Sequence, residues 1–241
     1  MDDQRRPSGR VESPVNSLSD LNLSHESLDS VLHHVGRLGV GVLQGWDAAA
    51  TTLVERDKVA TFGSTDDRVD PVDQFQYDKR SGPCVDALGG DVQYLDGNEI
   101  PPRWRQFAEF AANHDVYSVL SFPLCIDGEV IGALNFYSRE RDALRTGQRE
   151  EGSLFAAQAA VTVANAKSLQ EAMTQARQLE DALQTRTLIG QATGLLMGQE
   201  GLTSDEAFQR LVKVSQNANL KLREIAQRYV ETWESKARNG G

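Results

Sequence analysis

Cys84 is the clearest candidate for a chemically reactive side chain in this sequence, because its thiol follows the Gly82-Pro83 turn at the predicted start of a short helix. A thiol at a helix N-terminus has a lowered pKa, which makes Cys84 a candidate redox group or ligand contact. The alternative is a small packed thiol, since free cysteines are commonly buried. We predict no catalytic residue, because the sequence lacks the Gly-x-Ser-x-Gly, P-loop and Gly-x-Gly-x-x-Gly motifs.

The histidines do not suggest a metal site. None of His25, His33, His34 and His114 has a Cys, Asp or Glu at the spacing of metal ligands. We interpret His33 and His34 as solvated helix positions. The two cysteines, Cys84 and Cys125, are too few for a disulfide framework. We therefore predict no metal and no cofactor, and leave open an unknown small-molecule ligand.

Composition and hydropathy are typical of a cytoplasmic protein. The hydrophobic fraction is 39% and the charged fraction 25%. No apolar run approaches the roughly 20 residues that span a bilayer, and residues 1–27 lack the apolar core of a signal peptide. We predict no membrane partner. Residues 1–24 combine Arg, Asp, Ser, Pro and Gly, which predicts a disordered tail.

Residues 25–165 predict an antiparallel sheet flanked by helices, an α+β fold. Helices are expected over 27–38, within 66–76, from the turn at 81–84 through 88, over 103–113, and from about 147 onward. Strands are expected over 49–54, 59–64, 92–95, 116–126 and 129–137. Asp127-Gly128 joins the last two strands and favours a type I′ hairpin.

Four stretches of these elements, at 74–77, 81–88, 118–124 and 131–138, resemble a GAF domain of the type found before ANTAR modules. The resemblance implies a pocket beneath the loops between the middle helices. Residues from those segments are candidates to line an apolar ligand cavity; the alternative is that they fill the core. The Asn-Lys-Phe-Asp signature of cyclic-nucleotide binding is absent. The candidate pocket residues are Phe75, Tyr77, Cys84, Tyr94, Trp104, Phe107 and Ser121.

Residues 166–185 predict a helical linker that continues a heptad-like apolar pattern begun at Phe155. The pattern indicates a short parallel coiled coil and hence a homodimer, although Glu180 interrupts it. The alternative for the first half is a single helix lying on the sheet. The second half has little to pack on except a second chain.

Residues 186–241 predict an all-α bundle of three helices. The first is expected to bury Leu188, Ile189, Ala192, Leu195 and Leu196 and to stop at Gly198 and Gly201. Thr203 and Glu206 form a capping box at the start of the second. That helix is expected to bury Ala207, Phe208, Leu211 and Val214 or Ser215. The third is expected to bury Leu222, Ile225, Ala226, Tyr229, Val230 and Trp233.

The order of residues here, Ile-Gly-Gln-Ala-x-Gly-Leu-Leu-Met from Ile189, then Glu-Ala-Phe from Glu206, resembles an ANTAR domain, an RNA-binding module of transcription antitermination regulators. The resemblance implies that outward amides and hydroxyls read loop bases while Arg and Lys hold phosphates. For each residue alone, a solvated surface role is the alternative. The family often has a basic residue where Thr193 stands. The candidate RNA-binding residues are Arg186, Gln191, Thr193, Gly194, Arg210, Lys213, Ser215, Gln216, Asn219, Lys221 and Arg223.

Charge is divided between the two regions. Residues 186–241 hold eight Lys or Arg and six Asp or Glu, a net of +2, whereas the whole chain carries −10. A net of +2 provides no general polyphosphate field, so RNA binding would depend on a few placed contacts.

Together these patterns predict a signal-responsive regulator that binds stem-loop RNA in nascent transcripts and promotes antitermination, near RNA polymerase. The alternative is a ligand-sensing module that binds a protein partner without RNA. We do not expect an enzyme, because no nucleophile, base and orienting group occur together in a motif.

Overall fold

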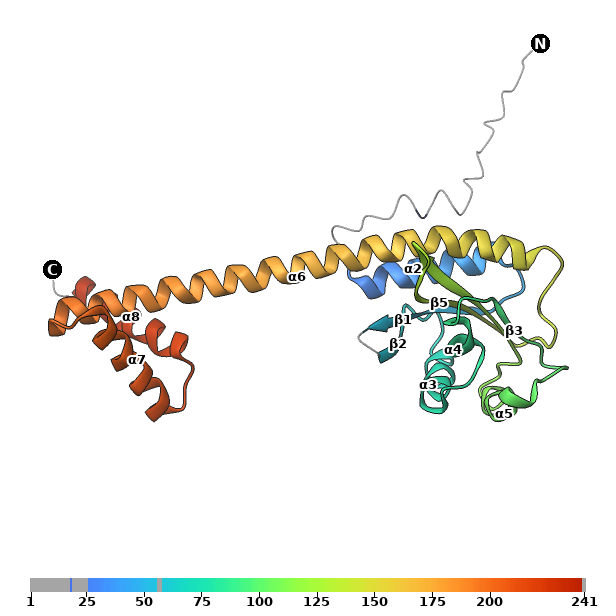
Figure 1. The fold of residues 1–241 in the computed structure, drawn as a ribbon, viewed down its shortest axis with the longest axis horizontal. Coiled ribbons are helices and arrows are strands. Elements are labelled where there is room, and N and C mark those ends of the chain that lie inside the picture. The colour runs from blue at the N-terminus through green and yellow to red at the C-terminus, as the bar shows by residue number, and fades with distance from the viewer. Residues whose placement is uncertain (1–17, 19–25, 56–57, 240–241) are drawn as a thin grey trace, which may run out of the picture. The chain divides into compact units, whose positions relative to one another are not determined.

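The computed structural model describes residues 18, 26–55 and 58–239, and the predicted tail over 1–24 lies almost wholly outside the described residues. The chain divides into two compact units between Gln170 and Glu171. Each unit has its own core, and each is described by itself below. Element labels follow Figure 1 and begin at α2.

The first unit is built on a five-stranded antiparallel sheet in the order β2-β1-β5-β4-β3 (Figure 1). The strands are β1 (Ala48–Glu55), β2 (Lys58–Phe62), β3 (Gln93–Leu95), β4 (Ser118–Ile126) and β5 (Glu129–Ser138). The β4–β5 turn places Asp127 at φ 50° and Gly128 at φ 85°, as a type I′ hairpin requires. The predicted α+β fold class is confirmed.

Helices cover both faces of this sheet (Figure 1). They are α2 (Leu28–Val42), α3 (Val69–Lys79), α4 (Pro83–Ala87), the 3-10 turn η1 (Pro102–Trp104), α5 (Arg105–Ala112) and the start of α6 (Gln148–Glu200). The helix α2 runs four residues beyond the predicted end at Leu38, because Val42 and the buried Leu43 continue its apolar face.

Alternating side chains divide the core into two clusters. On β4, Leu120, Phe122 and Leu124 join a cluster with residues of α2 and α6, while Val119 joins a second cluster with residues of α3 and α5. This division follows from the two-residue period of a strand. The helix α6 lies very close to the sheet at Gly152, where an added Cβ would come within 2.2 Å of the Phe122 ring.

The helix α6 is one continuous helix of 53 residues. The predicted linker and the predicted first bundle helix are therefore parts of a single element. Gly198 lies inside this helix and does not stop it; the helix ends at Glu200, and Gly201 follows with φ +69° and donates its N–H to Met197 O. A left-handed residue just after a helix is the conformation that glycine adopts without strain.

The second unit packs the end of α6 against α7 (Ser204–Ala218) and α8 (Leu222–Asn239). The capping box is confirmed: Thr203 Oγ1 accepts from Glu206 N, and the Glu206 carboxylate accepts from Thr203 N. The fully buried core is small, comprising Ala192, Leu196, Ala207, Leu211, Ile225 and Ala226.

Three side chains predicted for that core are exposed. Phe208 is 39%, Val214 44% and Trp233 41% exposed. The apolar stripe on each helix is wider than the surface that its two neighbouring helices cover. The side chains at the margins of the stripe therefore remain exposed. Trp233 is therefore a surface residue, and its surroundings become relevant to function.

Candidate nucleic-acid interface and sensor interior

Nine of the eleven predicted RNA-binding residues lie at the surface of the second unit. Arg186, Gln191 and Gly194 are on α6, whereas the other six are on α7, on α8 or at the turn between them. An added Cβ at Gly194 would meet no atom within 4 Å, so the space above it is open. The six predicted residues that are exposed in the α7–α8 region are Arg210, Lys213, Gln216, Asn219, Lys221 and Arg223.

Two predicted contacts point inward instead. Thr193 is only 8% exposed, and its Oγ1 donates to Ile189 O at 2.7 Å, so the prediction of an outward Thr193 was wrong. The small side chain fits the crowded face of α6 that packs in the bundle. Ser215 is half-buried, and its Oγ donates to Leu220 O at 2.6 Å across the α7–α8 turn. Both hydroxyls already have backbone partners.

Local structure also limits two of the exposed residues. Arg210 Nη2 lies 3.7 Å from Glu200 Oε2, so the carboxylate partly neutralises the positive charge of Arg210. Asn219 ends α7 in the left-handed conformation, with φ 52° and ψ 40°. Asn tolerates this conformation better than most residues, so Asn219 has a structural role beside any role in recognition.

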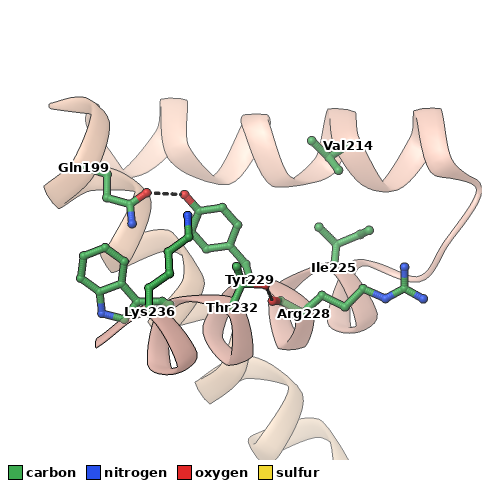
Figure 2. A pocket seen from close by; sticks show the side chains of 8 residues that line it. Gln199, Val214, Ile225, Arg228, Tyr229, Thr232 and Lys236 are labelled. Carbon is green, nitrogen blue, oxygen red and sulfur yellow. Dashed lines mark hydrogen bonds between the residues drawn. The ribbon is translucent and has the colours of Figure 1, made fainter. Parts of the chain in front are cut away.

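A groove of about 310 Å³ lies on the second unit between the end of α6, α7 and α8 (Figure 2). Tyr229 OH donates to Gln199 Oε1 at 2.7 Å within it. The groove is lined by Gln199, Val214, Ile225, Arg228, Tyr229, Thr232, Trp233 and Lys236. The lining combines two aromatic rings with two cations and contains no acidic residue.

This groove was not predicted from the sequence, because the apolar spacing of the third helix assigned Tyr229 and Trp233 to its buried stripe. A signal was present: Arg228 and Lys236 lie five residues before and three after Trp233. On a helix, residues three apart are neighbours. A cation beside the aromatic margin of a stripe indicates a stripe that reaches the surface.

The interior of the first unit holds a hydrogen-bonded polar network between the sheet and α3 and α4. Thr52 Oγ1 is hydrogen bonded to Tyr77 OH and to Cys84 Sγ, each at 2.9 Å. Asn135 Nδ2 donates to Thr52 Oγ1 at 2.8 Å and reaches Cys84 Sγ at 3.4 Å. These four residues come from four elements, β1, α3, α4 and β5, and they form a polar cluster inside the otherwise apolar core.

Asp73 lies at the other end of this network and is fully buried. Its carboxylate accepts from Tyr137 OH, Thr61 Oγ1 and Gln76 Nε2. Burial raises the pKa of Asp73 to about 6, although the hydrogen bonds from Tyr137 and Thr61 oppose the shift. The carboxyl group can therefore gain a proton in mildly acidic conditions.

Cys84 does not have the activated thiol that the sequence suggested. The residue is fully buried, and burial raises the pKa of its thiol well above the usual value. Its backbone N–H donates to Gln76 Oε1 at 2.9 Å. The helix α4 has only five residues, and its N-terminus does not outweigh desolvation. The expectation of a lowered pKa was wrong.

Three buried polar atoms of the first unit have no hydrogen-bond partner in the described parts of the chain: Thr51 Oγ1, Ser121 Oγ and Asn135 Oδ1. Ser121 and Asn135 face one another on β4 and β5. A buried polar group without a partner costs free energy. Their pairing marks a place where a small polar ligand group or a water molecule would be stabilised.

The predicted pocket residues do not all lie on one face of the sheet. Trp104 and Phe107 are buried in the cluster under α3 and α5, and Phe75 packs against it. Tyr94 packs instead against the cluster of α2 and α6, because it is paired with Leu120 in the register. Placing Tyr94 with the others was therefore wrong. Trp104 Nε1 donates to Asp86 Oδ2 at 3.0 Å, which satisfies the indole.

Within the described residues, no group of three or more His, Cys, Asp or Glu is placed to hold a metal ion. No helix among them is both long and apolar enough to cross a bilayer.

Several solved structures are similar to part of this chain at low identity. The GAF domain of a phosphoenolpyruvate-protein phosphotransferase from Coxiella burnetii is 15% identical, with a TM-score of 0.49, and the match covers 67% of this chain and 95% of that one. The corresponding domain from Acinetobacter is 12% identical, with a TM-score of 0.45, over 66% and 95%. A free methionine-R-sulfoxide reductase from Thermoplasma acidophilum is 17% identical, with a TM-score of 0.42, over 56% and 92%.

No curated protein matches the chain. Family profiles do match both units. The GAF domain profile matches residues 25–164, and the ANTAR domain profile matches residues 177–230. Both matches agree with the architecture above: a helix-covered antiparallel sheet, then helices around a small apolar core. The chain belongs to the GAF domain family and carries an ANTAR domain after its GAF domain, as in GAF and ANTAR domain-containing regulators.

Proposed function

We propose that this protein is a signal-responsive regulator that binds stem-loop RNA in nascent transcripts and promotes transcription antitermination. ANTAR domains bind RNA, and the GAF domain is a ligand-sensing domain. The observation that carries the proposal is the set of nine exposed cationic, amide and glycine positions on the ANTAR bundle. Such side chains hold phosphates and read the edges of unpaired bases.

In this mechanism the bundle binds the RNA by a few placed contacts. Lys213, Lys221 and Arg223 hold phosphates near the α7–α8 turn, while Gln191, Gln216 and Asn219 offer amide groups to loop bases. Bound RNA is withheld from a competing terminator hairpin, so transcription continues near RNA polymerase. Since the protein acts by binding, no covalent chemistry is needed, and a cytoplasmic location follows from the target.

A homodimer would present two bundles to two stem-loops. Support comes from apolar side chains exposed on the second unit: Met173 is 37%, Leu179 63% and Leu183 56% exposed. Phe208 on α7 is also exposed, and the groove beside it is lined by Ile189 and Arg186 of α6. Residues 166–185, the proposed linker, would pair in a parallel coiled coil.

The GAF unit, residues 25–165 in this proposal, would receive the signal as a small molecule. The unpaired Ser121 Oγ and Asn135 Oδ1, together with the network around Thr52 and Cys84, supply polar contacts under the sheet. A ligand that completes these hydrogen bonds favours one packing of α3 and α4 over another. That change would alter the pairing of the linker helices.

The second candidate is a ligand-sensing module that binds a protein without RNA. The exposed side chains of Met173, Leu179, Leu183 and Phe208 favour it, because exposed apolar side chains are typical of protein contacts. Self-association would explain the same side chains, so the oligomeric state of the RNA-free protein separates the two.

The test is binding of the full-length protein to labelled stem-loop RNA and to single-stranded RNA of the same composition. We expect a preference for the stem-loop and a slope of log affinity against log salt of roughly −2 to −4 per bundle, since each neutralised phosphate contributes about −0.7 to −0.9. Equal binding of the two RNAs by a folded protein would contradict the proposal.

Two kinds of variant separate phosphate contacts from base contacts. Lys213→Ala should weaken binding to every loop sequence alike, whereas Gln191→Ala should relax discrimination between loops. Because Asn219 is left-handed, Asn219→Gly is the matched variant that removes the amide and keeps the turn. Thr193→Lys is not a useful gain-of-contact variant, since Thr193 is buried.

A further inference from the structure

The groove on the second unit contains the most exposed indole among the described residues. Trp233 is 41% exposed, whereas Trp46 and Trp104 are 3% and 2% exposed. An exposed tryptophan leaves a large apolar surface in water, which a folded protein normally avoids. The indole lines the groove together with Tyr229 and Gln199, so a ligand placed there would contact more than one wall. Figure 2 shows Tyr229 and Gln199 facing one another in this groove.

The charges of this groove are available for a ligand. Arg228 and Lys236 line it, and neither forms an ion pair with an acid in the described parts of the chain, whereas Arg210 is paired with Glu200 and Arg238 with Glu234. The acids nearest in sequence, Glu231 and Glu234, are on α8 but do not line the groove. The site is therefore cationic, although α8 carries both signs.

Gln199 adds a hydrogen-bonding edge. Its Oε1 accepts from Tyr229 OH at 2.7 Å, which fixes the orientation of the amide (Figure 2). With the oxygen held by Tyr229, the Nε2 group remains to donate to an acceptor in the groove. A fixed donor beside an aromatic surface is suited to a planar ligand with acceptors on its edge.

We propose that an unpaired base of the RNA loop stacks on Trp233 in this groove, with Lys236 and Arg228 holding the flanking phosphates and Gln199 donating to the base edge. The inference rests on the proposed function and names a part of its interface. The combination of an aromatic ring and unpaired cations matches the stacking and phosphate contacts by which proteins bind single-stranded nucleotides. A double-stranded stem has no free base to offer.

The experiment uses the full-length protein and three RNAs: a stem-loop, the same stem closed as a blunt duplex, and single-stranded RNA of equal composition. Binding is measured by fluorescence anisotropy for the unaltered protein, Trp233→Ala and Trp233→Phe. We expect Trp233→Ala to bind the stem-loop about 5- to 150-fold more weakly, the range for loss of one base stacked on an aromatic ring. Trp233→Phe should retain most of the affinity, and binding to the blunt duplex should not change.

Tryptophan fluorescence gives a second, direct measurement. Stem-loop RNA should quench the emission of the unaltered protein, because a stacked base contacts the only exposed indole among the described residues. Trp233→Phe should abolish the quenching while leaving most of the binding. Quenching that persists in Trp233→Phe would overturn the inference.

Matched cation variants control for general electrostatics. Lys236→Ala should weaken stem-loop binding more than Arg238→Ala, because Arg238 is on the same helix but outside the groove and paired with Glu234. Equal effects of the two variants would indicate only a general loss of positive charge and would contradict the inference.

The outcomes separate the two hypotheses. If the unaltered protein prefers the stem-loop and Trp233→Ala binds it equally well, the groove is not a base site and the proposed function stands. If the unaltered protein has no preference for the stem-loop, both fail. If Trp233→Ala changes the oligomeric state of the RNA-free protein by light scattering, the groove contacts a second copy and the inference is wrong. Circular dichroism checks that each variant is folded.

Discussion

Trp104 in the GAF domain and Trp233 in the ANTAR domain have opposite environments. Trp104 is 2% exposed, its Nε1 donates to Asp86, and the Arg103 guanidinium lies 4.5 Å from its ring centroid. Trp233 is 41% exposed and lies in an open groove with Arg228 and Lys236. In both places a cation lies near an indole, yet only one indole contributes to a core.

The two domains differ in how many large side chains they bury. The GAF domain buries large side chains on both faces of a sheet and tolerates a polar network inside, because the network is almost fully hydrogen bonded. The ANTAR domain has a core of six small or medium side chains and leaves large ones at its margin. The large buried side chains are therefore concentrated in the first domain, and in the proposed function the second domain would bind RNA through its surface.

Trp104→Ala should produce the largest loss of stability. Removing a buried tryptophan typically costs about 3–5 kcal/mol, through lost burial and the remaining cavity. Denaturant unfolding of the full chain, followed by circular dichroism, measures the loss. Trp104→Phe is the control that retains a ring and should lose less. A loss below about 1 kcal/mol for Trp104→Ala would show that this indole is not part of a packed core.

The pH dependence of stability should follow Asp73. Its pKa is raised from 3.8 to about 6 by burial, so the folded state holds the proton more tightly than the unfolded chain. This contribution is fully present below about pH 4 and is lost as pH rises to about 6, with a total on the order of 3 kcal/mol. Asp73→Asn should flatten the unfolding free energy between pH 4 and 7. An equally steep profile in the variant would assign the dependence to other groups.

Thr203→Ala should cost about 1 kcal/mol, because it removes the side-chain acceptor that caps α7. The effect should be confined to the ANTAR domain, so amide hydrogen exchange of α7 is the suitable measurement. Thr203→Ser retains the hydroxyl and should exchange at nearly the original rate. Faster exchange in the GAF domain as well would indicate that the two domains unfold together.

Trp233→Ala should have the smallest effect on stability, within about 0.5 kcal/mol, because substitutions of exposed side chains usually fall in that range. Thermal unfolding of the unaltered protein and the variant tests this directly. The expectation complements the RNA measurement: a residue that matters little for folding and much for binding is a surface contact. A loss of several kcal/mol would return Trp233 to the core.

The sequence by itself determined most of the elements and their order, but not that the linker and the first bundle helix are one continuous helix. Two-residue alternation predicted the strands of the sheet, Asp127-Gly128 predicted the β4–β5 hairpin, and Thr203 with Glu206 predicted the start of α7. These signals are local, since each depends on side chains within a few residues of the chain. The two family resemblances also came from the sequence, and the family profiles confirm them.

Only the tertiary structure decided which side of each element is covered. Tyr94 and Trp104 were grouped by type, but strand register places Tyr94 on the opposite face of the sheet. Cys84 was expected to be activated by a helix N-terminus, but burial raises the pKa of its thiol, and the hydrogen bonds with Thr52 and Asn135 oppose that shift without reversing it. The apolar stripe of α8 has the same period whether its margin is buried or not. Burial depends on the partner surface, and the area available on α6 and α7 leaves Trp233 exposed.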